Sequence, residues 1–248
     1  MKRAERKKIK SNEFIDSVTK AQAALAEHQR QVMIGAVAIL VILVIGGGFA
    51  AWRSSRNAKA SALLASALTV AEAPVVAPPP PAPGSAPPIQ QPGTYRTEME
   101  RAQAALPLLT QAADAYPNTS AGITARFQAA ATLASLGRDA EAEQRYQDVI
   151  DKAGRNSIYG RTARLGLGET QLADGKTDQA ITTFQELSTD GGSDLPLDGV
   201  LMQLGRAYVQ AGKKEDAARA FTRIVQEFPD SPYSTDAKDQ LAAVKKVA

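Results

Sequence analysis

Few side chains in this sequence have the chemistry of a catalytic or metal site. His28 is the only histidine and lies in a basic tail without a nearby aspartate, and the chain has no cysteine. A Ser–His–Asp triad, a thiol nucleophile and a His/Cys metal site are therefore out of reach. Gly166-x-Gly168 lacks the Lys and Ser/Thr of a phosphate loop, and Asp190-Gly-Gly-Ser-Asp194 lacks the twelve-residue calcium pattern. Asn118-Thr119-Ser120 has the form of a glycosylation sequon, which helix N-capping explains well.

These observations predict a protein that is not an enzyme. We expect no catalytic residue, no cofactor, no metal ion and no small-molecule substrate. Residues 95–248 carry a net charge of −3, with 18 basic and 21 acidic side chains. A nucleic-acid-binding domain would concentrate basic charge on its folded part, so nucleic acid is not an expected partner either.

A pattern near the C-terminus predicts a helix–turn–helix hairpin. Leu201, Leu204 and Tyr208 are spaced i, i+3 and i+7, which places them on one face of a helix. Gly205 inside this helix costs up to about 1 kcal/mol relative to alanine, so we expect another helix to pack against its backbone. The pattern continues with a turn glycine, three apolar positions of a second helix and a terminating proline: Gly212, Ala217, Phe221, Ile224 and Pro229.

The same pattern occurs twice more upstream. One copy is Leu167-Gly168, Gln171, Gly175, Ala180, Phe184 and Leu187, and the other is Ala129-Ala130, Leu133, Gly137, Ala142, Tyr146 and Val149. The pattern resembles the tetratricopeptide repeat (TPR), with Leu201 in place of its tryptophan. Corresponding positions 130, 168 and 205 are 38 and 37 residues apart, so we expect extra residues beyond the usual period in the loops 153–157 and 189–196. The resemblance implies an all-α solenoid of hairpins.

A long apolar stretch precedes the hairpins. Val32 to Trp52 contains no charged residue over 21 positions, which is long enough to cross a hydrocarbon core of ~30 Å as a helix. Residues 1–31 carry eight Lys/Arg, and a short basic tail favours a cytoplasmic location. We therefore expect a single-pass transmembrane helix over 32–52 with the N-terminus in the cytoplasm. The tail 1–31 is either a topology signal or a contact for anionic lipid.

The region between this helix and the clear hairpins has two interpretations. Residues 53–73 read as an Ala-rich helix, 74–93 hold nine of the fourteen prolines and no charge, and 94–117 read as a helix that Pro107 kinks or restarts. The two helices are either the halves of a degenerate repeat with a disordered Pro-rich insertion, or elements flanking a free linker. The Pro-rich segment is a spacer or a ligand for a Pro-recognising domain.

The C-terminal part is organised more clearly. Residues 121–232 hold the three TPR hairpins, and 233–248 form a polar-faced helix that closes the core of the array. In TPR arrays the first helices line a groove that holds peptides or partner helices. The predicted partner-binding residues are Phe127, Leu165, Glu169, Met202, Arg206 and Val209. Packing between hairpins is the alternative for Phe127, Leu165 and Met202.

The layout of basic tail, membrane helix, Ala-rich helix and C-terminal hairpins resembles the YfgM-like family of bacterial inner-membrane TPR proteins, ancillary to the SecYEG translocon. That resemblance implies a periplasmic hairpin domain and protein partners: translocon subunits, periplasmic chaperones or client polypeptides. The segment Glu227–Tyr233 also resembles repeats in TPR proteins of the Tol-Pal and outer-membrane assembly systems. Two functions follow, an adaptor in protein translocation or chaperoning and a scaffold for cell-envelope assembly or division.

Overall fold

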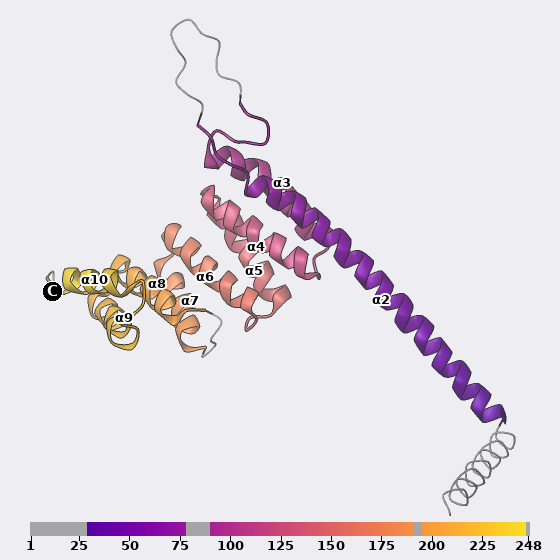
Figure 1. The fold of residues 1–248 in the computed structure, drawn as a ribbon. Coiled ribbons are helices and arrows are strands. Elements are labelled where there is room, and N and C mark those ends of the chain that lie inside the picture. Colours follow the sequence, from indigo (N-terminus) through magenta and orange to yellow (C-terminus); the bar gives the residue numbers. More distant parts are fainter. Residues whose placement is uncertain (1–28, 78–89, 191–194, 247–248) are drawn as a thin grey trace, which may run out of the picture. The chain divides into compact units, whose positions relative to one another are not determined.

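The computed structural model describes residues 29–77, 90–190 and 195–246 (Figure 1). In these residues all regular secondary structure is helical, apart from one isolated bridge between Val75 and Tyr95. The predicted all-α class is therefore confirmed for the described part of the chain. The chain divides into two compact units, residues 1–55 and 56–248.

Helix α2, Gln29–Ala71, supplies the described residues of the first unit and enters the second. Of the helices in the described ranges, one stretch, Met33–Ala71, is long and apolar enough to cross a membrane, by length and composition. A membrane span and a signal sequence both meet this criterion. Large apolar side chains between Met33 and Trp52 are exposed. Most of the basic tail, residues 1–28 with His28, lies outside the described residues.

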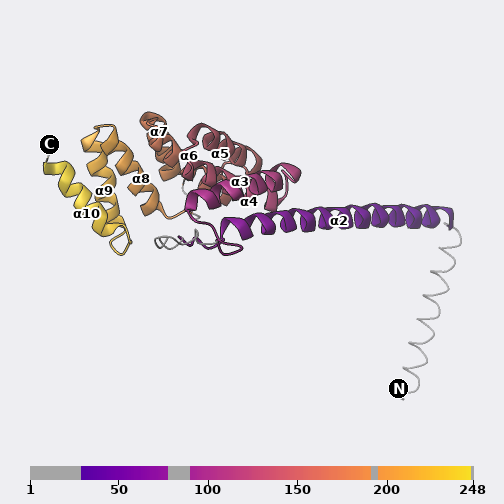
Figure 2. The ribbon, with the colours of Figure 1, turned by 90° about the horizontal axis from the view of Figure 1, so that it is seen from above.

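The second unit continues with eight described helices. They are α3 (Glu98–Ala115), α4 (Ser120–Ser135), α5 (Asp139–Ala153), α6 (Ile158–Ala173), α7 (Thr177–Thr189), α8 (Leu197–Gln210), α9 (Lys214–Glu227) and α10 (Ser234–Lys246). From α3 onward each helix contacts the next one, and α4 contacts α6 as α6 contacts α8. Figures 1 and 2 show this succession of helices as an array. The pairs α4–α5, α6–α7 and α8–α9 coincide with the three repeated patterns.

Local sequence signals set the ends of these helices. Gly137, Gly175 and Gly212 have positive φ values of 68°, 76° and 71° and stand between the two helices of each hairpin, as glycine C′ residues do. Thr119 caps α4 and Ser157 caps α6, each side chain accepting a hydrogen bond from a backbone N–H in the first turn. Residues 154–157 and 190–196 separate the hairpins, where the sequence places extra length; 191–194 lie outside the described residues.

The C-terminal part of α2 packs beside α3. Ala67 of α2 forms a buried cluster with Ala105 and Leu109 of α3 and with Ala129 of α4. Ala60, also in α2, is 1% exposed. Larger side chains of the two helices, among them Leu64, Leu106 and Leu108, pack against this cluster. Within the second unit, the last turns of α2 therefore pack against α3 and α4.

Both ends of the Pro-rich segment lie together at one point of the second unit. The Val76 N–H donates to the Tyr95 carbonyl at 2.8 Å, and the Tyr95 N–H donates to the Pro74 carbonyl at 3.0 Å. An Arg101 Nη1–H donates to the Ala73 carbonyl at 3.2 Å. Residues 78–89, most of the predicted insertion, lie outside the described residues.

Helix α3 departs from the sequence expectation at Pro107. The sequence predicts that Pro107 kinks or restarts the helix, and α3 runs from Glu98 to Ala115 with Pro107 inside it, so the helix does not restart there. Proline leaves the carbonyl four residues earlier, that of Gln103, without its helical partner. Both Gln103 and Pro107 are exposed, so this carbonyl lies on the solvent side of the helix, where its missing partner costs least.

Candidate protein-interaction site

Three of the predicted partner-binding residues are accessible. Because α4 contacts α6 and α6 contacts α8, the first helices of the hairpins adjoin one another. Glu169 on α6 and Arg206 and Val209 on α8 are exposed. The positions correspond between repeats: Glu169 aligns with Arg206 at the 37-residue offset, and with Ala131 of α4 at the 38-residue offset.

The other three predicted residues are packed to different degrees. Met202 is only 1% exposed and belongs to a core cluster that extends to Ala237 of α10. Leu165 is half-buried against the same cluster. The half-buried ring of Phe127 packs edge-on to Tyr146, with ring centroids 5.8 Å apart. Met202 is therefore inaccessible to a partner, and the alternative interpretation, packing between hairpins, applies to it.

Polar side chains connect the exposed residues of successive first helices. Gln203 donates a hydrogen bond to Glu169 at 2.7 Å, and Arg206 donates one to Asp236 of α10 at 2.8 Å. Burial raises the pKa of Glu169, while the hydrogen bond from Gln203 and the charge of Arg206 oppose this shift. We call the adjoining exposed sides of α4, α6 and α8 the first-helix face. The polar groups at its C-terminal end, on α6 and α8, are thus already paired within the protein.

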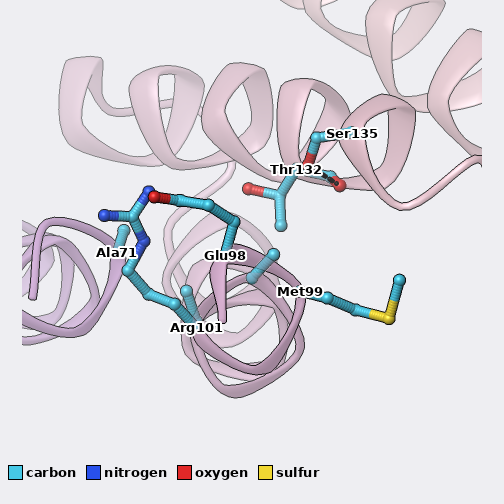
Figure 3. Close-up of a pocket in the computed structure, with 8 residues that line it drawn as sticks. Ala71, Glu98, Met99, Arg101, Thr132 and Ser135 are labelled. Carbon is cyan, nitrogen blue, oxygen red and sulfur yellow. Dashed lines mark hydrogen bonds and ion pairs between the residues drawn. The ribbon is translucent and has the colours of Figure 1, made fainter. Parts of the chain in front are cut away.

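A cavity of about 390 Å³ lies between α2, α3 and α4 (Figure 3). The last turn of α2, the first turns of α3 and the last turn of α4 line it. Its residues are Ala71, Glu98, Met99, Arg101, Ala102, Ala105, Thr132 and Ser135. The Met99 side chain is 61% exposed, and Figure 3 shows it extending away from Glu98 and Arg101.

Two arginines are buried at corresponding positions of α4 and α6. The Arg164 side chain is 2% exposed and pairs with Asp190 and, at 3.3 Å, with Glu186 of α7. The more exposed Arg155 also pairs with Glu186. Buried arginines require such partners, because an unpaired buried charge costs several kcal/mol.

Arg126 in α4 is paired less completely. Its Nη2 donates to the Ala113 carbonyl at 3.2 Å and to Asp114 at 3.4 Å, and its Nε lies 4.0 Å from Asp148 of α5. In the described part of the chain, Nε and Nη1 have no hydrogen-bond partner. Arg126 therefore has less electrostatic compensation than Arg164.

The titratable side chains form no metal cluster in the described ranges. No group of three or more His, Cys, Asp or Glu residues there has the arrangement needed to hold an ion. The ion pairs join neighbouring helices instead: Lys176 pairs with Glu143 of the preceding hairpin at 2.8 Å, and Lys213 pairs with Asp178 at 2.8 Å. These hydrogen-bonded carboxylates raise the pKa of both lysines. The pairs therefore link successive hairpins.

Comparison with known proteins decides the family. A family model described as a tetratricopeptide repeat-like domain matches residues 25–231. The chain belongs to this family. No curated protein matches the chain.

Solved structures agree with this assignment at the level of the fold. The TPR-like repeats of a kinesin light chain-like protein from Podosopora anserina superpose with a TM-score of 0.52 at 16% identity, over 59% of this chain and 78% of that chain. MamA from Desulfovibrio magneticus RS-1 is 18% identical, with a TM-score of 0.45, over 59% of this chain and 81% of that chain. The superposition on the kinesin light chain-like repeats, together with the family model, confirms the predicted TPR solenoid fold.

The TPR assignment explains the glycine pair in α6. A Cβ added to Gly168 would lie 2.5 Å from Cε1 of Phe184, and one added to Gly166 would lie 2.5 Å from Cζ of Tyr146. Gly168 therefore receives a ring from its own hairpin, and Gly166 receives one from the preceding hairpin. Gly166-x-Gly168 is a packing feature of the TPR-like array.

The other features of this site differ in how far the sequence indicates them. One sequence feature indicates the cavity indirectly. The alanines at 71, 102 and 105 leave space between helices when no larger side chain fills it. The buried arginines, Arg126 and Arg164, have a signal in their register, since each stands four residues before the position equivalent to Gly205. That is the tryptophan position of the TPR pattern, where a packed side chain is expected.

Proposed function

We propose that this TPR-like protein is a membrane-anchored adaptor for protein–protein interaction. The observation that carries the proposal is the solvent-accessible face of the adjoining first helices, on which Glu169, Arg206 and Val209 are exposed. Surfaces of this composition bind a helix or an extended segment of a partner. The apolar helix over Val32–Trp52 supports anchoring.

The proposal extends to location and partners. The hairpins face the periplasm of a bacterial inner membrane, and the protein acts beside the translocation machinery or its chaperones. Support comes from the basic N-terminal tail, which favours the cytoplasmic side, and from the layout shared with translocon-associated TPR proteins. The expected partners are translocon subunits, periplasmic chaperones or client polypeptides.

Two measurements test these statements. A topology reporter fused after Ala248 should give a periplasmic signal, and a cytoplasmic signal would contradict the proposed orientation. Crosslinking in intact membranes, followed by purification of the full-length chain, should recover translocon or periplasmic chaperone subunits. Recovery of neither would exclude the translocation role. Depletion that changes cell shape or envelope integrity with normal secretion would favour the scaffold function instead.

A further inference from the structure

The second unit begins with a run of helix α2 whose charged residues are all basic. Arg56 and Lys59 are its first charged residues, and no aspartate or glutamate occurs before Glu72. The Lys59 side chain is exposed, and in the part of the chain that the structure describes it takes part in no ion pair. The charge of Lys59 can therefore meet an anion outside the protein.

Arg56 brings a second element to this part of α2. Its guanidinium carbon lies 6.0 Å from the centroid of the Tyr116 ring, within the range of a cation–π interaction. Tyr116 follows the last residue of α3 and stands in the turn to α4, residues 116–119, where Asn118 is exposed. A ring contacts the face of a guanidinium and a phosphate binds its N–H edge, so the two contacts are compatible. We call Arg56, Lys59 and the turn 116–119 the basic corner.

The acidic residue closest in sequence to this turn is already used within the protein. Asp114 accepts a hydrogen bond from Arg145 at 3.0 Å and lies 3.4 Å from Nη2 of the buried Arg126. Two guanidiniums share this one carboxylate, so Asp114 does not neutralise Arg56 and Lys59. The basic corner keeps a net positive charge, which is complementary to phosphate groups.

The sequence position of the basic corner indicates which phosphates it meets. Arg56 and Lys59 follow Trp52, the last residue of the apolar stretch, by four and seven residues, and α2 is helical throughout. At 1.5 Å per residue these steps are about 6 and 10 Å along the helix. The headgroup layer on each side of a ~30 Å hydrocarbon core is about 5–8 Å thick. Arg56 therefore falls within this layer, and the long side chain of Lys59 reaches it from just outside.

We propose that the basic corner binds the headgroups of anionic phospholipids and so holds the α3–α4 turn at the bilayer surface. This site depends on the proposed membrane anchor and adds to it a preference for negatively charged lipid. Phosphatidylglycerol has the required chemistry, because no cation in its headgroup balances the phosphate. Phosphatidylcholine has the same phosphate with a quaternary ammonium, and is the matched neutral lipid.

The only tryptophan in the sequence reports on the lipid beside this corner. Trp52 is four residues from Arg56, and lipids with brominated acyl chains quench tryptophan fluorescence. The full-length protein is reconstituted in mixtures of phosphatidylcholine and phosphatidylglycerol, with bromine on one of the two lipids at a time. The dependence of quenching on composition gives the binding constant of phosphatidylglycerol relative to that of phosphatidylcholine.

We expect phosphatidylglycerol to bind at least about fivefold more tightly, the gain typical of one basic residue at an anionic surface. Arg56→Gln combined with Lys59→Gln should lower this ratio at least about threefold. Lys59→Gln alone, a change confined to an exposed side chain, should also lower it, so the test does not depend on the contact between Arg56 and Tyr116. High salt should reduce the ratio of the wild-type protein, because it screens the charges.

Two controls keep the effect specific. Arg56→Lys retains the charge and should preserve the ratio. Lys238→Gln combined with Lys245→Gln removes the same charge from exposed positions of α10 and should leave the ratio unchanged.

Equal binding of the two lipids by the wild-type protein would overturn the inference. A ratio that the Arg56 and Lys59 variants retain would do the same, since the preference would then belong to Arg53. An equal decrease in the α10 control would reject the site in favour of net charge alone. Quenching by neither brominated lipid would contradict the membrane anchor itself, and the site with it.

Discussion

At the residue scale, glycines on the first helices make room for aromatic rings of the second helices. Phe221 lies against Gly205 as Phe184 lies against Gly168, and a Cβ at Gly205 would come within 2.4 Å of the Phe221 ring. Real Cβ atoms do not approach rings so closely, so the ring or the helix would have to move. Closer packing of the two helices thus offsets the free-energy cost of placing a glycine inside a helix.

Gly168→Ala should destabilise the second unit by about 1–3 kcal/mol, the usual range for overpacking a core. Gly199→Ala is a matched control, because Gly199 is also helical and its added Cβ would be 3.4 Å from the Tyr233 ring, an ordinary contact. Urea unfolding of the full-length protein measures both variants. Equal stability of the two would contradict the ring-on-glycine account.

Ionisation of the Tyr146 phenol is expected to lower the stability of the folded protein in alkali. Burial, followed by the nearby Glu169 carboxylate, raises the pKa of Tyr146 from its ordinary value near 10 to about 12. A raised folded-state pKa contributes stability below the unfolded pKa, and this contribution is lost as the pH rises toward the folded pKa. The loss between about pH 10 and pH 12 is on the order of 2 kcal/mol.

Tyr146→Phe has no phenol to ionise, so its stability should fall less over the same pH range. Unfolding curves of the two proteins across this window give the comparison. Parallel loss of stability in both would show that Tyr146 does not carry the effect.

Helical periodicity predicts on which side of a helix a residue lies, but not how deeply its side chain is buried. Periodicity identified the exposed positions Glu169, Arg206 and Val209 on the first helices. It could not show that Met202 is buried, because this depends on the core cluster shared with α10. Arg164 was missed because a long charged side chain is usually solvated, and only the acidic residues of α7 make its burial tolerable.

At the scale of the element, a buried residue of the first helix and the residue that faces it on the second helix change together from one hairpin to the next. Arg164 of α6 pairs with Glu186 of α7. The equivalent residues 37 positions later are Leu201 of α8, which is 1% exposed, and Arg223 of α9, which pairs with Glu227. An arginine at 201 would meet another arginine, so the apolar residue and the basic residue occur together.

Leu201→Arg should therefore destabilise the α8–α9 hairpin, on the order of 3 kcal/mol, because the buried guanidinium would lie beside Arg223, while Glu227, the residue equivalent to Asp190, is already paired with Arg223. Adding Arg223→Glu recreates the arrangement of the preceding hairpin and should recover part of the loss. Chemical denaturation of the single and double variants gives the coupling between the two sites. A double variant no more stable than Leu201→Arg would reject the matched pair.

The elements themselves were largely predictable. Glycine turns, apolar spacing and terminal prolines located the three hairpins, since these signals act within a few residues of the ends they set. Whether Pro107 would restart α3 was not decided by the local sequence, because the exposure of Gln103 and Pro107 depends on how the helix packs. The hydrogen bonds between Pro74–Val76 and Tyr95 join residues about twenty positions apart, beyond the reach of local patterns.

At the scale of the whole array, α10 closes the core at its C-terminal end. Its inner residue Ala237 is fully buried beside the α8–α9 core, while its neighbour Lys238 is exposed. In a repeat array each hairpin interacts chiefly with its neighbours. Damage at α10 should therefore spread into α8 and α9 before it reaches α4 and α5.

Ala237→Glu places an unpaired carboxylate in this core and should increase amide hydrogen exchange in α8 and α9, with α4 and α5 still protected. Lys238→Glu makes a charge change of similar kind on the exposed side and should leave exchange unchanged. Mass spectrometry of the full-length protein resolves these regions. Uniformly faster exchange throughout the array would mean that it unfolds as one cooperative unit.

The hydrogen bonds between Pro74–Val76 and Tyr95 make the first part of the array tolerant of added sequence. The chain leaves and re-enters this region at one point, so the spacing of α2 and α3 does not depend on how many residues lie between. Closing a loop of doubled length costs only about 0.6 kcal/mol more. An entire fluorescent domain inserted there would report on the protein in living cells while both termini keep their native sequence.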